Sequence, residues 1–428
     1  MRHVRLSVTR CVTLILLAGA VLAWPLVAAT PTARPEEVGL STERLHRIND
    51  LIQRNIDAGT FSGAVTLVAR QGRIAHLEAQ GLMDIESRKP MQKDAIFRIM
   101  SMTKPVVGVS IMMMIEEGKV RLTDPVSKFI PEMKDLKVAV AMTPAGPPPP
   151  PNAPARFYAV PAEREITVRD LLTHTSGLVS GGISNREAQR VALKGKETLA
   201  DYLPRLGGVP LDFQPGTRWA YSAQAGFDTL ARIVEITGGM PFDRFAKQRI
   251  FDPLGMKDTF FYPAEGNPRM ATLYRRGEKG LEKQNNPGFM NGAYFSGGGG
   301  LMSTAEDYLQ FAQMLLNGGE LNGKRLLGSK TVEVMTSVAA PDTLPGRSKG
   351  ESYGLSVRVV NDPVARSSFM SAGTFGWSGA FGTHFFVDPH ERIVGILMAQ
   401  TPDQQVRLDF ENAVMHAIVG NSTLSGTN

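Results

Sequence analysis

The sequence predicts an α+β protein in which both chain ends build one antiparallel sheet with flanking helices, and a mostly helical region is inserted between them. Two observations lead to this expectation. Strand patterns gather in the first and last parts of the chain, at about residues 35–95 and 290–420, each with a helical segment beside them. Between them, from about residue 96 to 290, apolar residues recur at helical spacing and strand patterns nearly vanish.

The amino-terminal elements are predicted to be a helix followed by a β-hairpin. Ser41 is a good N-cap residue, and the apolar residues after it recur at helical spacing until Gly59 ends the pattern, namely Leu45, Ile48, Leu51, Ile52 and Ile56. An apolar run at 63–70, a Gln71-Gly72 turn and a second strand from Arg73 form the hairpin.

The carboxy-terminal third repeats the strand patterns and closes with a helix. Strands are expected at 353–360, 382–387 and 392–401. A last helix is expected over about 405–419, with Leu408, Val414 and Ile418 near one face. The simplest way to bury these strands is to pair them with the amino-terminal hairpin in one sheet.

One segment fits neither part. Residues 138–162 are rich in alanine and proline and contain five consecutive prolines, Pro147 to Pro151. Such a run favours the extended polyproline conformation and excludes a helix. We expect an exposed loop.

Composition and charge are those of an ordinary soluble protein. Hydrophobic residues make up 43% of the 428 residues and charged residues 21%, which fits neither disorder nor a bundle of membrane helices. The formal net charge is +6, and three of the arginines lie in residues 1–29, which hold no acidic residue. The remaining charge of +3 and the lack of lysine and arginine blocks interleaved with aromatics give no indication of nucleic-acid binding.

Residues 1–29 have the pattern of a secretory signal peptide. Arg2, Arg5 and Arg10 precede an apolar stretch, and Val27 and Ala29 occupy the −3 and −1 positions of a cleavage site after Ala29. An uncleaved membrane anchor is the alternative, although the apolar run is short for a span of ~30 Å. We therefore expect a periplasmic or secreted protein of residues 30–428 with no stable membrane anchor. Its only cysteine, Cys11, would be removed, which excludes disulfides and cysteine nucleophiles.

A single Ser-x-x-Lys occurs in the chain, at Ser101-Met102-Thr103-Lys104. Pro105 follows, and proline is tolerated only near the start of a helix. Ser101 is therefore expected in or just before a first helical turn, with Lys104 on the same face. A serine nucleophile needs such a nearby cation or base, together with N–H donors for the oxyanion. Alone the motif is weak, because an N-cap serine beside a surface lysine has the same pattern.

Further motifs follow this one in order. They are Phe97 to Pro105; Ile166 to Leu178, which contains Leu171-Leu172-Thr173-His174-Thr175-Ser176-Gly177; Tyr221-Ser222-Ala223; Pro253-Leu254-Gly255-Met256; Gly297-Gly298-Gly299-Gly300-Leu301; and Gly376-Trp377-Ser378-Gly379. This series resembles the serine β-lactamase-like superfamily, in its class C β-lactamase and family VIII carboxylesterase branch. The resemblance covers about residues 35–420. It implies the β-lactamase/transpeptidase-like fold, with the active site where the two parts meet.

The resemblance also implies roles for particular residues. Ser101 corresponds to the nucleophile, Lys104 to its activating partner, and Tyr221 to the residue that exchanges protons with the nucleophile and leaving group. A free tyrosine has a pKa near ~10, so a phenolate base needs a cation close by. Trp377-Ser378-Gly379 stands where β-lactamases carry Lys-Thr-Gly, on the strand at the edge of the pocket. The backbone N–H groups of Ser101 and Ala380 are the implied oxyanion donors.

Two departures from the β-lactamase pattern bear on the substrate. Ala223 replaces the asparagine of Tyr-Ser-Asn, so it offers no side-chain amide to a substrate. Trp377 replaces a lysine that would face a carboxylate, a contact typically worth ~1.5–3 kcal/mol. Both favour a carboxylesterase on short-chain or neutral esters over a β-lactamase, D-amino-acid peptidase or acyltransferase, which remain alternatives of the same fold. A non-catalytic penicillin-binding-like envelope protein is the alternative from another class.

Other motifs have plainer interpretations. Gly346-Arg347-Ser348-Lys349-Gly350 matches Gly-x-Ser-x-Gly but lies in loop sequence, where that motif carries no nucleophile. His174 is interpreted as a hydrogen-bonded structural histidine. His384 and His390 lack the spacing of metal ligands, and Gly297 to Gly300 lacks the residues of a phosphate loop. No metal and no cofactor is expected; the expected partner is a small ester or amide, and the sequence leaves the oligomeric state open.

Overall fold

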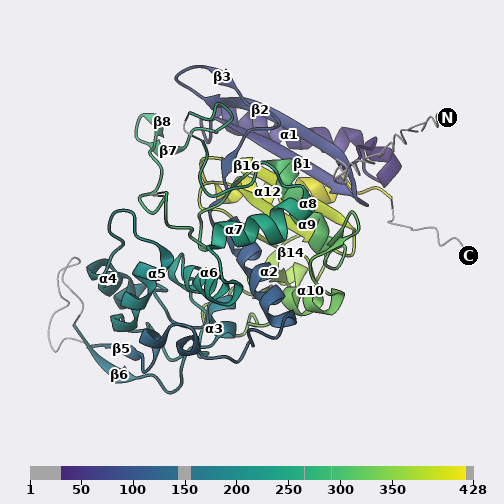
Figure 1. Ribbon diagram of the computed structural model, residues 1–428. Coiled ribbons are helices and arrows are strands. Elements are labelled where there is room, and N and C mark those ends of the chain that lie inside the picture. The colour runs from purple at the N-terminus through teal and green to yellow at the C-terminus, as the bar shows by residue number, and fades with distance from the viewer. Residues whose placement is uncertain (1–29, 143–155, 265, 291, 421–428) are drawn as a thin grey trace, which may run out of the picture.

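One antiparallel sheet of eight strands joins the two ends of the chain in the computed structural model, which describes residues 30–142, 156–264, 266–290 and 292–420. The amino-terminal strand β1 pairs with the carboxy-terminal strand β16, so strands from opposite chain ends lie side by side (Figure 1). The strands follow in the order β12 (Glu351–Tyr353), β13 (Arg358–Val360), β14 (Phe375–Ser378), β15 (His384–Asp388), β16 (Ile393–Ala399), β1 (Gly63–Arg70), β2 (Arg73–Asp84) and β3 (Lys89–Pro90).

The sheet has a hydrophobic core on each face. Two helices from the chain ends cover the face with the smaller core. Helices α1 (Thr42–Asp57) and α12 (Gln404–His416) pack against each other and share a core with β1 and β16. On the other face α9 (Ala305–Leu316) contacts β1, β15 and β16. Side chains alternate between these faces along β16: Ile393 and Leu397 join the first core, Val394 and Ile396 the second. The predicted α+β architecture is therefore confirmed.

The middle of the chain is mainly helical and lies beside the sheet (Figure 1). Helix α2 (Thr103–Glu116) is buried from Thr103 to Met114 and packs against α6 (Ala225–Gly238), because its sequence is apolar on every side. The remaining helices are α3 (Val168–Leu172), α4 (Gly182–Arg190), α5 (Leu199–Tyr202), α7 (Phe242–Ala246), α8 (Asp252–Leu254), α10 (Ser329–Thr336) and α11 (Pro363–Arg366). Within the described ranges, none of the helices is both long and apolar enough to cross a membrane.

The segment 353–360, predicted as one strand, is two. Strands β12 and β13 pair with each other, with Ser352 opposite Val359. A tight turn separates them, in which the Gly354 N–H donates to the Val357 carbonyl at 2.8 Å and Ser356 has a φ of 79°. No proline or Asn-Gly pair marks this turn, so periodicity alone did not reveal it.

Strands that the sequence did not predict lie in the inserted region and just after it. They form the hairpins β5 (Lys137–Ala141) with β6 (Phe157–Pro161) and β7 (Tyr274–Gly277) with β8 (Gly280–Lys283), and the short pair β4 (Phe97–Arg98) with β9 (Met302–Ser303). The expectation that 138–162 is wholly a loop is wrong at both ends, where Val138 pairs with Val160. β4 and β9 have only two residues each, and the strands of the two hairpins are short and partly exposed, so none shows the apolar alternation that identifies a strand. The five prolines, like the predicted signal peptide, lie outside the described residues.

Candidate active site

Ser101 lies where the chain turns from β4 into the buried helix α2. A short 3₁₀ turn, Met100–Met102, precedes α2, and Pro105 is the third residue of that helix, as its missing N–H requires. Met100 has a φ of 46°, a left-handed conformation that costs a non-glycine residue about 1–3 kcal/mol. The turn holds the Ser101 hydroxyl at a fixed position beside the sheet.

The three residues singled out by sequence meet at the Ser101 oxygen. Lys104 Nζ lies 3.1 Å and Tyr221 Oη 2.7 Å from Ser101 Oγ. Lys104 is fully buried, and its ammonium also donates to the carbonyls of Ala223 and Gly298, both at 2.7 Å. An ammonium has three protons, so all three are engaged in this arrangement.

Aromatic rings hold Tyr221 in place. Its ring centroid lies 4.7 Å from that of His174 and 5.7 Å from that of Trp377, and Lys104 Nζ lies 4.9 Å from the Tyr221 centroid. His174 Nδ1 accepts a hydrogen bond from the Ser222 N–H at 3.2 Å. Burial, together with the Lys104 and Arg347 charges, holds the pKa of His174 well below its usual value. His174 is thus buried and accepts a hydrogen bond, as expected, and its purely structural role stays a prediction.

The glycine-rich segment approaches α6 so closely that it requires glycine. A Cβ on Gly298 would lie 2.6 Å from the Gln224 Cα. The Gly298 N–H donates to Asp228 Oδ1 at 2.8 Å, and Ser296 Oγ and Tyr294 Oη each donate to the same carboxylate at 2.7 Å. Burial raises the pKa of Asp228. Asp228 thus fixes the segment in which the Gly298 carbonyl accepts a hydrogen bond from Lys104.

Sequence reasoning missed Asp228. Its only sequence signal is a lone acidic residue inside the mostly apolar first half of a helix, Ala225 to Ala231. Such a residue is also a common surface position, and it becomes informative only once its burial is known.

The end of strand β14 forms one wall of a cavity of about 280 Å³. This cavity is lined by Ser101 and Tyr221 and, from β14 and the residues after it, by Trp377, Ser378, Gly379 and Ala380. A Cβ on Gly379 would lie 2.4 Å from the Ile99 carbonyl oxygen, so glycine permits β14 to approach the Ser101 turn. The two residues whose N–H groups were predicted as oxyanion donors, Ser101 and Ala380, therefore border one space.

The structure also shows where Ala223 and Ser348, the serine of the Gly-x-Ser-x-Gly sequence, lie. Ala223 contributes its carbonyl to Lys104 and borders a neighbouring cavity of about 340 Å³. Ser348 lies exposed in a turn and is not among the residues lining the Ser101 cavity.

His384 lies between two polar side chains. Its Nδ1 is 2.9 Å from Ser378 Oγ and its Nε2 is 3.0 Å from a Glu411 carboxylate oxygen. Among residues that the structure describes, no group of three or more histidine, cysteine or acidic side chains could hold a metal ion.

A serine and a lysine one helical turn apart, facing a tyrosine at the junction of an antiparallel sheet and a helical region, define a serine hydrolase of the β-lactamase/transpeptidase-like fold. The chain belongs to the beta-lactamase family, whose family model matches residues 48–418.

The relatives and solved structures agree with this family. Protein Rv1367c from Mycobacterium tuberculosis is 36% identical over 395 residues, covering 87% of this chain and 93% of the relative. Esterase EstB from Burkholderia gladioli is 30% identical over 398 residues, with the same coverage of 87% and 93%. The structure of EstCE1, a hydrolase with promiscuous acyltransferase activity, superposes with a TM-score of 0.73 at 25% identity, covering 88% of this chain and 99% of EstCE1.

Proposed function

We propose that this protein is a carboxylesterase that cleaves short-chain esters through an acyl-enzyme on Ser101. The observation that carries the proposal is the position of Ser101 Oγ between Lys104 Nζ and Tyr221 Oη, at 3.1 and 2.7 Å, on the wall of a small cavity. The similarity to the esterase EstB supports ester chemistry.

We propose that Tyr221, and not Lys104, takes the proton of Ser101. The Lys104 ammonium forms three hydrogen bonds, to Ser101 Oγ, Ala223 O and Gly298 O. In this charged form the lysine has no lone pair with which to accept a proton. Lys104 Nζ also lies 4.9 Å from the centroid of the Tyr221 ring, so a positive charge borders the side chain that contacts Ser101. In this mechanism the Tyr221 phenolate takes the Ser101 proton while Oγ attacks the ester carbonyl carbon.

The remaining steps follow from the same arrangement. The N–H groups of Ser101 and Ala380 stabilise the oxyanion of the tetrahedral intermediate. The intermediate collapses by breaking the bond to the alkoxy oxygen, which receives the proton from Tyr221 and leaves as the alcohol. A water then loses a proton to Tyr221, attacks the acyl carbon, and Ser101 leaves with that proton. The products are a carboxylic acid and the free enzyme.

The residues that replace β-lactamase motif residues argue for esters over β-lactams. The indole of Trp377, half-buried on the cavity wall, stands in place of a lysine, and Ala223 has no amide group. Loss of both the cation and the donor amide could weaken transition-state binding of a β-lactam by several kcal/mol, on the order of 10² or more in rate. We expect kcat/KM for 4-nitrophenyl butyrate to exceed that for a chromogenic cephalosporin by a factor on the order of 10². A higher value for the cephalosporin would instead support the β-lactamase alternative.

Two variants and one mass measurement test the nucleophile. Wild-type protein incubated with an organophosphonate should gain the mass of one phosphonyl group, located on Ser101 by peptide mapping. Ser101→Ala should lose both this adduct and esterase turnover, whereas Ser348→Ala should retain both. Turnover that survives Ser101→Ala and disappears in Ser348→Ala would overturn the proposal. An unmodified, inactive wild-type protein would favour the non-catalytic envelope protein.

We also propose that the protein acts outside the cytoplasm, in the periplasm or after secretion. The support is the sequence pattern of residues 1–29, with arginines before an apolar stretch and small residues at the cleavage positions.

A further inference from the structure

Tyr221, the base in the proposed mechanism, lies on a segment without regular secondary structure. Residues 218–222 form neither a helix nor a strand, and α6 begins only at Ala225. The hydrogen bonds of a helix or a strand therefore do not fix this segment. A general base has to lie within ~2.6–3.2 Å of the atom whose proton it takes. Contacts with other parts of the chain must therefore hold Tyr221 in position.

His174 binds the backbone on both sides of Tyr221. Its carbonyl accepts a hydrogen bond from the Ala220 N–H at 3.0 Å, and its Nδ1 accepts one from the Ser222 N–H at 3.2 Å. Its ring also packs against the Tyr221 ring, with centroids 4.7 Å apart. One residue thus contacts the base and both of its neighbours in the chain.

His174 is itself held at the end of a well-anchored helix. It follows α3, and its N–H donates to the Leu171 carbonyl at 3.3 Å. Asp170 fixes the start of α3, because its carboxylate accepts hydrogen bonds from Thr167 and from the guanidinium of Arg164. His174 has a φ of 57°, a left-handed conformation that histidine and asparagine adopt more readily than most side chains. This turn places both the imidazole and the carbonyl of His174 beside the segment that carries the base.

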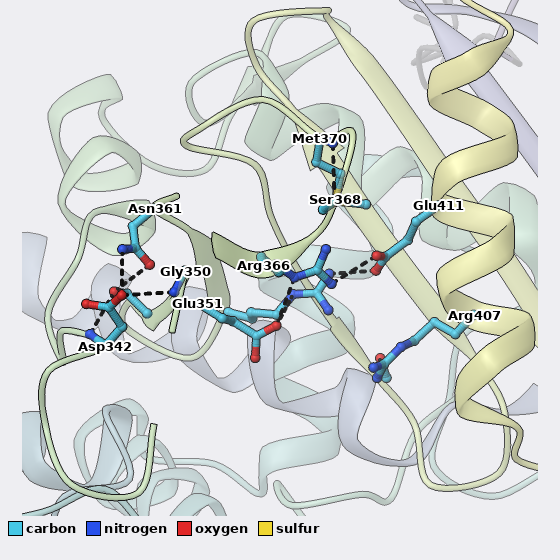
Figure 2. Close-up of polar contacts among 12 residues, drawn as sticks. Asp342, Gly350, Glu351, Asn361, Arg366, Ser368, Met370, Arg407 and Glu411 are labelled. Atoms are coloured by element: carbon cyan, nitrogen blue, oxygen red, sulfur yellow. Dashed lines mark hydrogen bonds and ion pairs between the residues drawn. The ribbon is translucent and has the colours of Figure 1, made fainter. Parts of the chain in front are cut away.

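A second support comes from the loop that precedes β12. The Trp219 N–H donates to the Pro345 carbonyl of this loop at 2.8 Å. Figure 2 shows how Asp342 holds the loop: its carboxylate accepts hydrogen bonds from the Gly350 N–H at 2.9 Å and from Asn361 Nδ2 at 3.1 Å. The loop supports the segment two residues before the base, whereas the contacts of the histidine lie at the base itself.

Packing alone does not explain a histidine at position 174. His174 is 1% exposed and lies among the rings of Trp219, Phe227 and Tyr353, where a phenylalanine ring would also pack. Because Nδ1 accepts from Ser222, the proton of the neutral ring is on Nε2, which is buried and has no hydrogen-bond partner among the described residues. An unpaired buried N–H is costly. What the imidazole offers and phenylalanine lacks is the acceptor at Nδ1.

His174 is not placed to react with a substrate. It is not among the residues that line the cavity of Ser101, and its Nδ1 is engaged by a backbone N–H. Its influence on the reaction must therefore pass through Tyr221.

We propose that His174 is a positioning residue, whose contacts with the peptide groups on both sides of Tyr221 hold the phenol oxygen 2.7 Å from Ser101 Oγ. The inference rests on the proposed esterase function, in which Tyr221 takes the Ser101 proton. It replaces the purely structural role that the sequence predicts for His174. A segment without this support would displace the phenol oxygen, and a displacement of about 1 Å can lower a rate about 10²-fold.

Two substitutions separate the acceptor from the ring. His174→Phe keeps a ring and loses the acceptor, whereas His174→Asn loses the ring and places Oδ1 where Nδ1 was. His174→Phe should lower kcat for 4-nitrophenyl butyrate about 10- to 100-fold with little change in KM, and His174→Asn should retain more of the wild-type kcat. The reverse order of the two variants would show that the ring matters and would overturn the proposal. His174→Leu, which also lacks the acceptor, takes the place of His174→Phe if that variant does not fold.

His76 provides the matched control. It is a buried histidine on β2, 7% exposed, whose Nε2 lies 2.8 Å from Thr66 Oγ1, and it lines a different cavity from that of Ser101. His76→Phe therefore also removes a buried hydrogen bond, and it should lower the free energy of unfolding and leave kcat unchanged. A loss of kcat equal to that of His174→Phe would attribute both effects to general destabilisation and would refute the positioning role.

A double variant tests whether His174 acts through Tyr221. Effects of residues that act as a unit do not add. In the Tyr221→Phe background, His174→Phe should therefore change the acylation rate less than about threefold, although it lowers the rate of the wild type far more. Losses that multiply in the double variant would contradict the proposal.

Crystal structures separate this inference from the proposed esterase function. In His174→Phe the Tyr221 oxygen should lie beyond hydrogen-bond distance of Ser101 Oγ, and in His174→Asn the contact of 2.7 Å should remain. If the wild type hydrolyses no ester, the esterase function fails, while this displacement still supports the positioning role. Ester turnover by the wild type, with an unmoved Tyr221 and an unchanged kcat in His174→Phe, refutes the positioning role and leaves the esterase function standing.

Discussion

Replacing Tyr221 with phenylalanine removes one oxygen atom and leaves the ring that fills the site. The ring contacts His174 and Trp377, with centroids 4.7 and 5.7 Å away, so its packing should survive in Tyr221→Phe. The variant loses the 2.7 Å contact with Ser101 Oγ, a hydrogen bond typically worth ~0.5–1.5 kcal/mol to stability. The rate should suffer far more, because a positioned general base contributes about 10²–10⁴-fold.

Stopped-flow acylation with 4-nitrophenyl butyrate and thermal unfolding of the same preparation separate these two effects. We expect the acylation rate of Tyr221→Phe to fall about 10²–10⁴-fold, with a change in the free energy of unfolding of about 1 kcal/mol. Lys104→Arg should also be severely impaired, but less so, because arginine keeps the charge although it cannot reproduce the compact ammonium donating to three oxygens. Near-normal acylation by Tyr221→Phe would refute the role of Tyr221 as the base.

Three further predictions follow from the site, the buried histidine and the amino terminus. Asp228→Ala should lower the free energy of unfolding, measured in urea, by about 2–5 kcal/mol and should also lower kcat, because the buried Ser296 hydroxyl and Gly298 N–H lose their acceptor. A wild-type free energy of unfolding together with a wild-type kcat would contradict the positioning role of Asp228. Burial lowers the pKa of His384 in the folded protein to about 4. As pH falls from about 6.5 toward 4, the unfolded chain therefore binds a proton at this histidine before the folded protein does, and the folded protein should lose stability. A melting temperature that stays constant over this range would contradict that expectation. Amino-terminal sequencing of exported protein should begin near Thr30, whereas membrane-bound protein retaining residues 1–29 would favour an anchor.

The chemistry-bearing motifs were predictable from the sequence because their spacing is local. Ser101 and Lys104 are three residues apart in the chain, and Pro105 marks the start of the helix that carries Lys104, so Ser101 was expected in or just before its first turn, within reach of Lys104. The hairpin at the amino terminus and the terminal helices were predictable for the same reason, since periodicity and capping are local properties. The meeting of Ser101 with Tyr221 and β14 was inferred from the family resemblance, because no local rule connects residues so far apart.

Other features required the tertiary structure. Arg407 and Glu411 lie on adjacent turns of one helix and are equally ordinary in sequence, yet Glu411 is fully paired whereas Arg407 faces the cavity without an ion-pair partner among the described residues. Asp228 likewise has a role only because α6 faces the glycine-rich segment. Local patterns in the sequence predicted the hairpin, the terminal helices and the Ser-x-x-Lys motif, since these depend on residues within a few positions of one another. The charge balance of the site depends on which distant side chains share a desolvated space, and only the packing of sheet and helices decides that.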